Sequence, residues 1–163
     1  MQWSDVLDDP SLRDLPYKIE LDAQGRLLMS PASNRHGIQQ AKLVQLLARR
    51  LIEGEIATEC SIGTHAGVKV ADVVWMSPAF LRQHGDTTPY PQAPELCIEI
   101  LSPSNTAAEM QDKIRLYLGY GAQEVWTLSD AGRISLFGPE GERSRSGLPR
   151  MAAIENFSLL TDL

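Results

Sequence analysis

The stretch that decides the fold is Leu96-Cys97-Ile98-Glu99-Ile100-Leu101, an apolar run interrupted by one carboxylate. A run of this length and composition is typical of a strand buried on both faces of a sheet. A carboxylate buried there without a partner costs several kcal/mol or takes up a proton. Glu99 therefore indicates a functional site at this strand, and we interpret it as part of a metal site.

A second acid lies in a similar apolar strand. Asp72 stands within Val68–Met76, and a long proline-containing connection (77–94) separates that strand from the one carrying Glu99. Such a connection allows the two strands to be neighbours in the sheet. Two carboxylates at neighbouring strand ends, with the carbonyl of Ile100 as a further oxygen, are ligands suited to Mg²⁺ (or Mn²⁺).

The bulk composition limits the classes of protein that remain. The chain has 163 residues, 43% of them hydrophobic, and a net charge of -6. This predicts one globular domain over 1–163, with 1–16 as an N-terminal arm. The acidic charge argues against strong non-specific binding of nucleic acid through the overall field. The chain contains no apolar stretch long enough for a membrane span and begins with acidic residues, so we expect a cytoplasmic protein with no membrane contact.

Hydrophobic periodicity predicts the order of the elements. The expected elements are a hairpin (17–21 and 26–29), a helix (35–53), two strands (55–76), a short helical turn (79–83), a strand (96–101), a helix to about residue 120, a hairpin (124–128 and 133–137) and a last strand or docking segment near 154–160. Strands grouped around so few helices predict an α/β domain of the α+β kind, with a mixed sheet and helices packed on it.

The helix expected at 35–53 carries two polar residues of interest. An apolar arc is expected at Ile38, Ala41, Val44, Leu47, Ala48, Leu51 and Ile52. Gln40 falls inside that arc, one turn beyond His36. This spacing predicts that His36 and Gln40 face inward together.

A lysine on the next helix completes a set of residues that supports hydrolysis. Lys113 lies at the edge of the side that carries Met110, Ile114 and Tyr117. A cation held by the two acids polarises a phosphoryl oxygen and lowers the pKa of a bound water, which favours phosphodiester hydrolysis. Lys113 is then placed to orient the water or to neutralise charge in the transition state.

The order and spacing of these motifs resemble a known bacterial family. The motifs are Tyr17 with Glu20, Gly25 to Pro31, His36 at a helix start, Asp72-Val73, Glu99 to Ser104, Asp112-Lys113 with Tyr117, and Glu124-Val125-Trp126. In this order they resemble the family of "putative restriction endonucleases", small proteins with the PD-(D/E)XK restriction-endonuclease-like fold. The resemblance covers about residues 17–137.

That resemblance implies roles for the individual residues. Asp72 and Glu99 match the metal ligands. Lys113 matches the catalytic lysine, which has moved to the helix because Leu101 occupies its usual place in the motif. Glu20 matches an acid near the same metal.

The resemblance also places His36 and Gln40 near the substrate. In one respect the chain departs from the family pattern, since Ala71 stands where a proline usually precedes the first acid. A proline shapes the backbone and binds no metal, so the site itself is retained.

The resulting prediction is a Mg²⁺-dependent endodeoxyribonuclease that acts on DNA as a homodimer, because two sites related by a two-fold axis cut both strands most simply. Three alternatives stay open. The protein is a non-catalytic binding or regulatory protein that keeps the scaffold, in line with its pI of about 5.0. It acts on RNA or a small nucleotide. Or the charged residues form structural ion pairs, such as Asp72 with Lys69 or Lys113.

Overall fold

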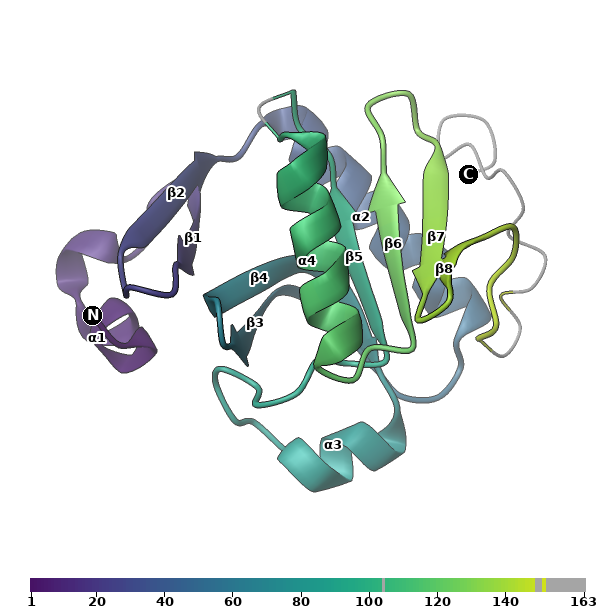
Figure 1. Ribbon diagram of the computed structural model, residues 1–163, viewed down its shortest axis with the longest axis horizontal. Helices are drawn as coiled ribbons and strands as arrows, with labels where there is room; N and C mark the ends of the chain where they lie inside the picture. The colour runs from purple at the N-terminus through teal and green to yellow at the C-terminus, as the bar shows by residue number, and fades with distance from the viewer. Residues whose placement is uncertain (104, 149–150, 152–163) are drawn as a thin grey trace.

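A six-stranded mixed sheet forms the centre of the computed structural model, which describes residues 1–103, 105–148 and 151 (Figure 1). The strands lie in the order β3 (Glu55–Thr64), β4 (Gly67–Met76), β5 (Leu96–Ile100), β6 (Glu124–Leu128), β7 (Ile134–Gly138) and β8 (Gly141–Arg143). The pair β5–β6 is parallel, and the other neighbouring pairs are antiparallel. The predicted mixed α+β sheet is confirmed.

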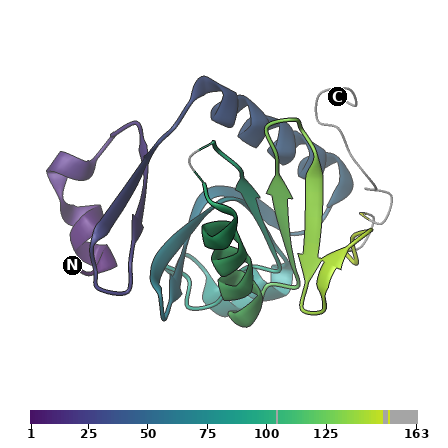
Figure 2. The same ribbon diagram turned by 45° about the horizontal axis from the view of Figure 1, so that its top comes forward.

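The parallel pair explains the position of helix α4 (Ala107–Gly119). Parallel neighbours need a crossover connection, and α4 provides it between β5 and β6. Met110, Ile114 and Tyr117 are buried on the α4 side of the sheet, as the periodicity predicted. In Figures 1 and 2, α4 covers one face of the sheet and α2 (Asn34–Arg50) the other.

The buried face of α2 includes Leu47 of the expected arc, and Leu51 just after the helix is also buried, but the rest of the arc differs. Leu43, Leu46 and Leu47 pack on Val73 and the neighbouring strands, whereas Ile38 is 59% exposed. Apolar residues occur on more than one side of this helix, so their periodicity does not choose the contact face. Packing against the sheet chooses it. The helix also ends at Arg50 instead of residue 53, because the backbone is already extended at the next position.

The N-terminal hairpin stands apart from the main sheet. Its strands β1 (Tyr17–Leu21) and β2 (Leu27–Pro31) form a separate two-stranded sheet. Leu21 packs with Val6 of α1 (Trp3–Asp8) and with Val68 of β4 in a small apolar cluster. This cluster fixes β1 beside β4, and Figure 2 shows the hairpin at the end of the molecule beyond β3 and β4.

The remaining elements are short. Helix α3 (Pro78–His84) extends slightly beyond the expected turn, a 3-10 helix η1 spans Pro10–Leu12, and β8 was not predicted. The segment expected near 154–160 lies outside the described residues. In the described part of the chain, every helix is too short or too polar to cross a lipid bilayer.

Candidate active site

A cleft of about 860 Å³ opens between the hairpin, the sheet and α4. Charged side chains from five elements line it: Lys18 and Glu20 of β1, His36 of α2, Asp72 of β4, Glu99 of β5 and Lys113 of α4. The structure therefore brings together the residues that the sequence singled out, from Glu20 to Lys113, which lie up to 93 positions apart.

Asp72 and Glu99 meet because of the register of the sheet. Strands β4 and β5 are paired from Trp75↔Leu96 to Val73↔Ile98, so the next opposite pair is Asp72 and Glu99. Opposite residues of an antiparallel pair point to the same face. The two strands separate here, and the Ile100 N–H donates to Asp72 Oδ2 at 2.6 Å. The Asp72 side chain thus accepts a hydrogen bond that a backbone carbonyl of the neighbouring strand would otherwise accept.

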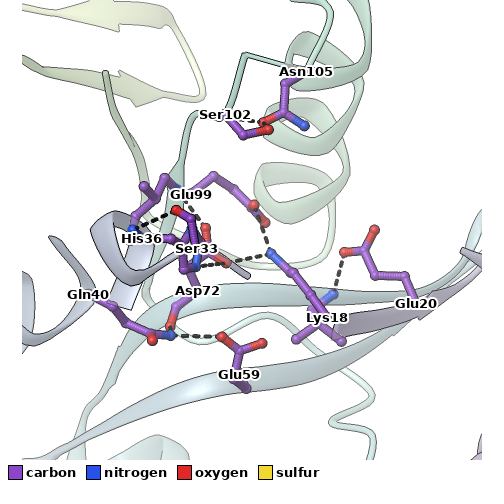
Figure 3. A network of polar contacts seen from close by, with 12 residues as sticks. Lys18, Glu20, Ser33, His36, Gln40, Glu59, Asp72, Glu99, Ser102 and Asn105 are labelled. Carbon is purple, nitrogen blue, oxygen red and sulfur yellow. Dashed lines mark hydrogen bonds and ion pairs between the residues drawn. The ribbon is translucent and has the colours of Figure 1, made fainter. Parts of the chain in front are cut away.

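A lysine that the sequence analysis did not select lies between the two acids. Lys18 Nζ is 2.6 Å from Asp72 Oδ1 and 3.2 Å from Glu99 Oε2 (Figure 3). Burial lowers the pKa of Lys18, but the charges of Glu99 and Asp72 outweigh burial and raise it above the ordinary value. Strand alternation places Lys18 and Glu20 on one face of β1, but this pattern is equally typical of a face exposed to solvent.

The pKa of Asp72 shifts in the opposite direction to that of Lys18. Burial raises the pKa of this carboxyl, but its hydrogen bond with His36 and the charge of Lys18 together lower it below the ordinary value. Asp72 is 1% exposed. It is therefore an ionised acid held in the protein interior by positive neighbours.

Lys113 joins the acids on the α4 side of the cleft. Its Nζ lies 2.7 Å from Glu20 Oε1 and 3.2 Å from Glu99 Oε1. Glu20 also accepts a hydrogen bond from the Val70 N–H at 2.8 Å. Burial raises the pKa of Glu20, but the charges of Lys113 and Lys18 lower it overall.

Tyr117 fixes the position of Glu99. Its hydroxyl donates to Glu99 Oε1 at 2.6 Å, and its side chain is fully buried. Burial, followed by the charge of Glu99, raises the pKa of Tyr117 well above the ordinary value, so the hydroxyl remains a donor. Tyr117 lies one helical turn after Lys113, and this spacing directs both side chains toward one acid.

His36 and Gln40 reach the site from the start of α2, in line with their spacing. The Ser33 hydroxyl caps the helix by accepting from the His36 N–H at 3.1 Å. His36 Nε2 lies 3.4 Å from Asp72 Oδ1, and this hydrogen bond is the main cause of the raised pKa of His36. Gln40 Nε2 donates to the Asp72 carbonyl at 2.8 Å.

Glu59 is a further acid that the sequence analysis missed. It faces Asp72 across β3 and β4, where its backbone has φ 53°, and its Oε1 accepts from Gln40 Nε2 at 2.8 Å. His36, Glu59 and Asp72 each offer a ligand atom, and the three atoms lie within 4.8 Å of one another. These residues form a second donor set that shares Asp72 with the first.

The loop after β5 forms the rim of the cleft beside Glu99. Asn105 Oδ1 accepts hydrogen bonds from the Ser102 N–H at 2.8 Å and from the Ser102 hydroxyl at 3.0 Å. These bonds close a turn at the carboxyl end of β5, next to the acids in Figure 3.

Comparison with known proteins agrees with this architecture. The model of the family Uma2, described as "Putative restriction endonuclease", matches residues 8–157. A crystal structure from Anabaena variabilis ATCC 29413, described as a "putative nuclease belonging to DUF820", has a TM-score of 0.74 and 17% sequence identity, covering 98% of this chain and 96% of that one. This similarity shows a shared restriction-endonuclease-like fold. No curated protein matches. Because the family match spans nearly the whole chain, the protein belongs to the Uma2 family of restriction-endonuclease-like proteins.

Proposed function

We propose that the protein is a divalent-metal-dependent endonuclease that hydrolyses DNA phosphodiester bonds, with Mg²⁺ or Mn²⁺ as the ion. The observation that carries this proposal is the convergence of Asp72, Glu99 and Lys113 in one open cleft. The family description and the description of the Anabaena variabilis protein both name nucleases, which supports the same reaction class.

The donor set suits a hard divalent cation. The single nitrogen of Lys18 contacts oxygens of both Asp72 and Glu99, so the two carboxylates face one common position. Carboxylate oxygens are preferred ligands of Mg²⁺, and these two acids with the Ile100 carbonyl would hold the ion. When bound, such an ion polarises a phosphoryl oxygen and lowers the pKa of a bound water.

The second donor set bears on the choice of ion. His36, Glu59 and Asp72 combine an imidazole nitrogen with two carboxylates. Imidazole suits transition metals, whereas carboxylate and water ligands suit Mg²⁺ and Mn²⁺ alike. An ion bound by these three residues would therefore be Mn²⁺ in preference to Mg²⁺.

The protein's own side chains account for positioning and charge. The Lys113 ammonium orients the attacking water or neutralises charge on the phosphate as it develops. Glu20 holds this ammonium at 2.7 Å, and Tyr117 holds Glu99. His36 and Gln40, at the cleft edge, are placed to contact the substrate.

Plasmid cleavage tests the proposal. Purified protein is incubated with supercoiled DNA and Mg²⁺ or Mn²⁺, and the same assay is run on Asp72→Asn and Glu99→Gln variants. We expect each substitution to lower the rate by ~100-fold or more, because even partners of metal ligands cost 10- to 100-fold. Glu142→Gln on β8 is the matched control and should cleave as the wild type does. Undiminished cleavage by both site variants would refute this assignment.

The same assay with RNA defines the substrate, since cleavage of RNA but not of DNA would show that RNA is the target.

We further propose a homodimer, because two sites related by a two-fold axis can cut both strands of a duplex. Light scattering at the concentration used for cleavage checks the oligomeric state. A monomer that still makes double-strand breaks would contradict the dimer.

One observation favours a second candidate, a non-catalytic binding or regulatory protein. Lys18 and Lys113 already neutralise the charges of Asp72 and Glu99. Calorimetry with Mn²⁺ separates the two functions. The enzyme hypothesis predicts binding that is lost in Glu99→Gln, whereas the non-catalytic hypothesis predicts no binding by either protein.

A further inference from the structure

Lys18 occupies the position that both site acids face. We propose that its ammonium is a built-in substitute for the metal ion: it holds Asp72 and Glu99 together while no cation is bound, and a divalent cation displaces it. This inference rests on the proposed metal-dependent function. It concerns a residue on the N-terminal hairpin, outside the sheet that carries the acids.

The contacts show why the metal-free site needs Lys18. Asp72 is 1% exposed and Glu99 is 2% exposed, so little solvent is available to screen their mutual repulsion. Lys18 Nζ lies 2.6 Å from an oxygen of the first and 3.2 Å from an oxygen of the second. The ammonium thus offsets the repulsion between the two facing carboxylates and holds them close together.

Electrostatics also requires that the lysine and the ion exclude each other. A divalent cation bound to the same two oxygens would lie against the ammonium, and like charges at that separation repel strongly in a buried site. Asp72 directs its other oxygen to the Ile100 N–H, so the two cations would compete for the same Asp72 oxygen, Oδ1.

The position of Lys18 in the fold allows it to leave. The side chain extends from β1 into the open cleft, and β1 forms no part of the six-stranded sheet. Lys113 differs in this respect, because its shortest ion pair is with Glu20 and not with the acid pair. Withdrawal of Lys18 therefore leaves the sheet and the contacts of Lys113 with Glu20 in place.

Metal titration tests this exclusion. Mn²⁺ affinity is measured by calorimetry for wild type, Lys18→Met and the matched control Lys69→Met. Lys69 lines the same cleft, but its Nζ contacts the Leu21 carbonyl at 3.3 Å. We expect Lys18→Met to bind Mn²⁺ at least ~10-fold more tightly than wild type, about 1.4 kcal/mol. Lys69→Met should change affinity by less than ~3-fold, because its ammonium contacts a backbone carbonyl, whereas that of Lys18 contacts both acids. Equal or weaker binding by Lys18→Met overturns the inference.

Amine labelling of the wild type gives a second test that needs no variant. Acetylation of Lys18 and Lys69 is followed by peptide mass spectrometry with and without saturating Mg²⁺. The Lys18 amine, held in two ion pairs, should react slowly without metal and at least ~10-fold faster with it, whereas Lys69 should react at one rate. An unchanged Lys18 rate at saturating metal overturns the inference even if Lys18→Met does not fold.

The outcomes separate this inference from the proposed function. Suppose that Lys18→Met binds metal more tightly but the wild type cleaves no DNA: the displacement of Lys18 by a cation is then supported, and the nuclease function is wrong. If the wild type cleaves DNA and Lys18→Met has unchanged metal affinity, the nuclease function is supported and the displacement of Lys18 is wrong. If no variant binds Mn²⁺ or Mg²⁺, both are wrong.

Discussion

Replacing Tyr117 with Phe removes one hydroxyl and tests how the protein supports a buried acid. The hydroxyl donates to Glu99 Oε1 at 2.6 Å, and both side chains are buried. A hydrogen bond to a charged group contributes about 1.5–3 kcal/mol, and the phenyl ring fills nearly the same volume, so no cavity term is added. Glu99 keeps its contacts with Lys113 and Lys18. We therefore expect the free energy of unfolding to fall by about 2 kcal/mol.

Urea unfolding of the metal-free protein measures this change through the transition midpoint and its slope. The matched control is Tyr90→Phe, since the Tyr90 hydroxyl donates at 3.0 Å to the neutral Gly85 carbonyl near the surface. That variant should lose less than about 1 kcal/mol. Because Tyr117 holds Glu99, which we propose as a metal ligand, its loss should also weaken Mn²⁺ binding by about 10-fold. A smaller stability loss for Tyr117→Phe than for Tyr90→Phe would show that the contact with Glu99 does not support the fold.

Three other outcomes follow from contacts that do not involve Asp72 or Glu99. Glu124→Gln should lower the free energy of unfolding by about 3 kcal/mol in thermal melts, because the buried Glu124 carboxylate accepts from Trp126 Nε1 and Ser146 Oγ, and an amide nitrogen in its place cannot accept. Thr106→Ala should cost about 1 kcal/mol, since it removes the capping box at the start of α4; helix protection in hydrogen exchange reports the change. Burial raises the pKa of the Cys60 thiol to about 12, so at pH 8 it should resist a thiol reagent until urea unfolds the protein.

Several elements were predictable because their patterns had one physical solution. The apolar run at β5 (Leu96–Ile100) is too short for a helix and too apolar for an exposed strand, and all five of its residues are buried. Met110, Ile114 and Tyr117 repeat at helical spacing on a single side of α4, so the packing face was clear. The face of α2 was not, because that helix offers apolar residues on several sides.

The acids of the site were visible for a related reason. Asp72 and Glu99 stand out as charges within apolar strands, which local sequence displays directly. Lys18 and Glu59 lie in strands of mixed polarity, where a charged residue on alternate positions is ordinary. No local signal distinguishes such residues from a solvated strand face, so they were missed.

The linear order of residues was sufficient to specify most of the strands and helices, the two buried acids and the lysine of α4, because each depends on neighbours within a few positions. Lys18 lies 54 positions from Asp72 and 81 positions from Glu99 along the chain, and its contact with both acids depends on where a separate hairpin packs against β4. The donor set of His36, Glu59 and Asp72 likewise depends on α2, β3 and β4 meeting at one point. Charges interact through space and not along the chain, so only the tertiary structure decides that Lys18 is the cation between the two acids.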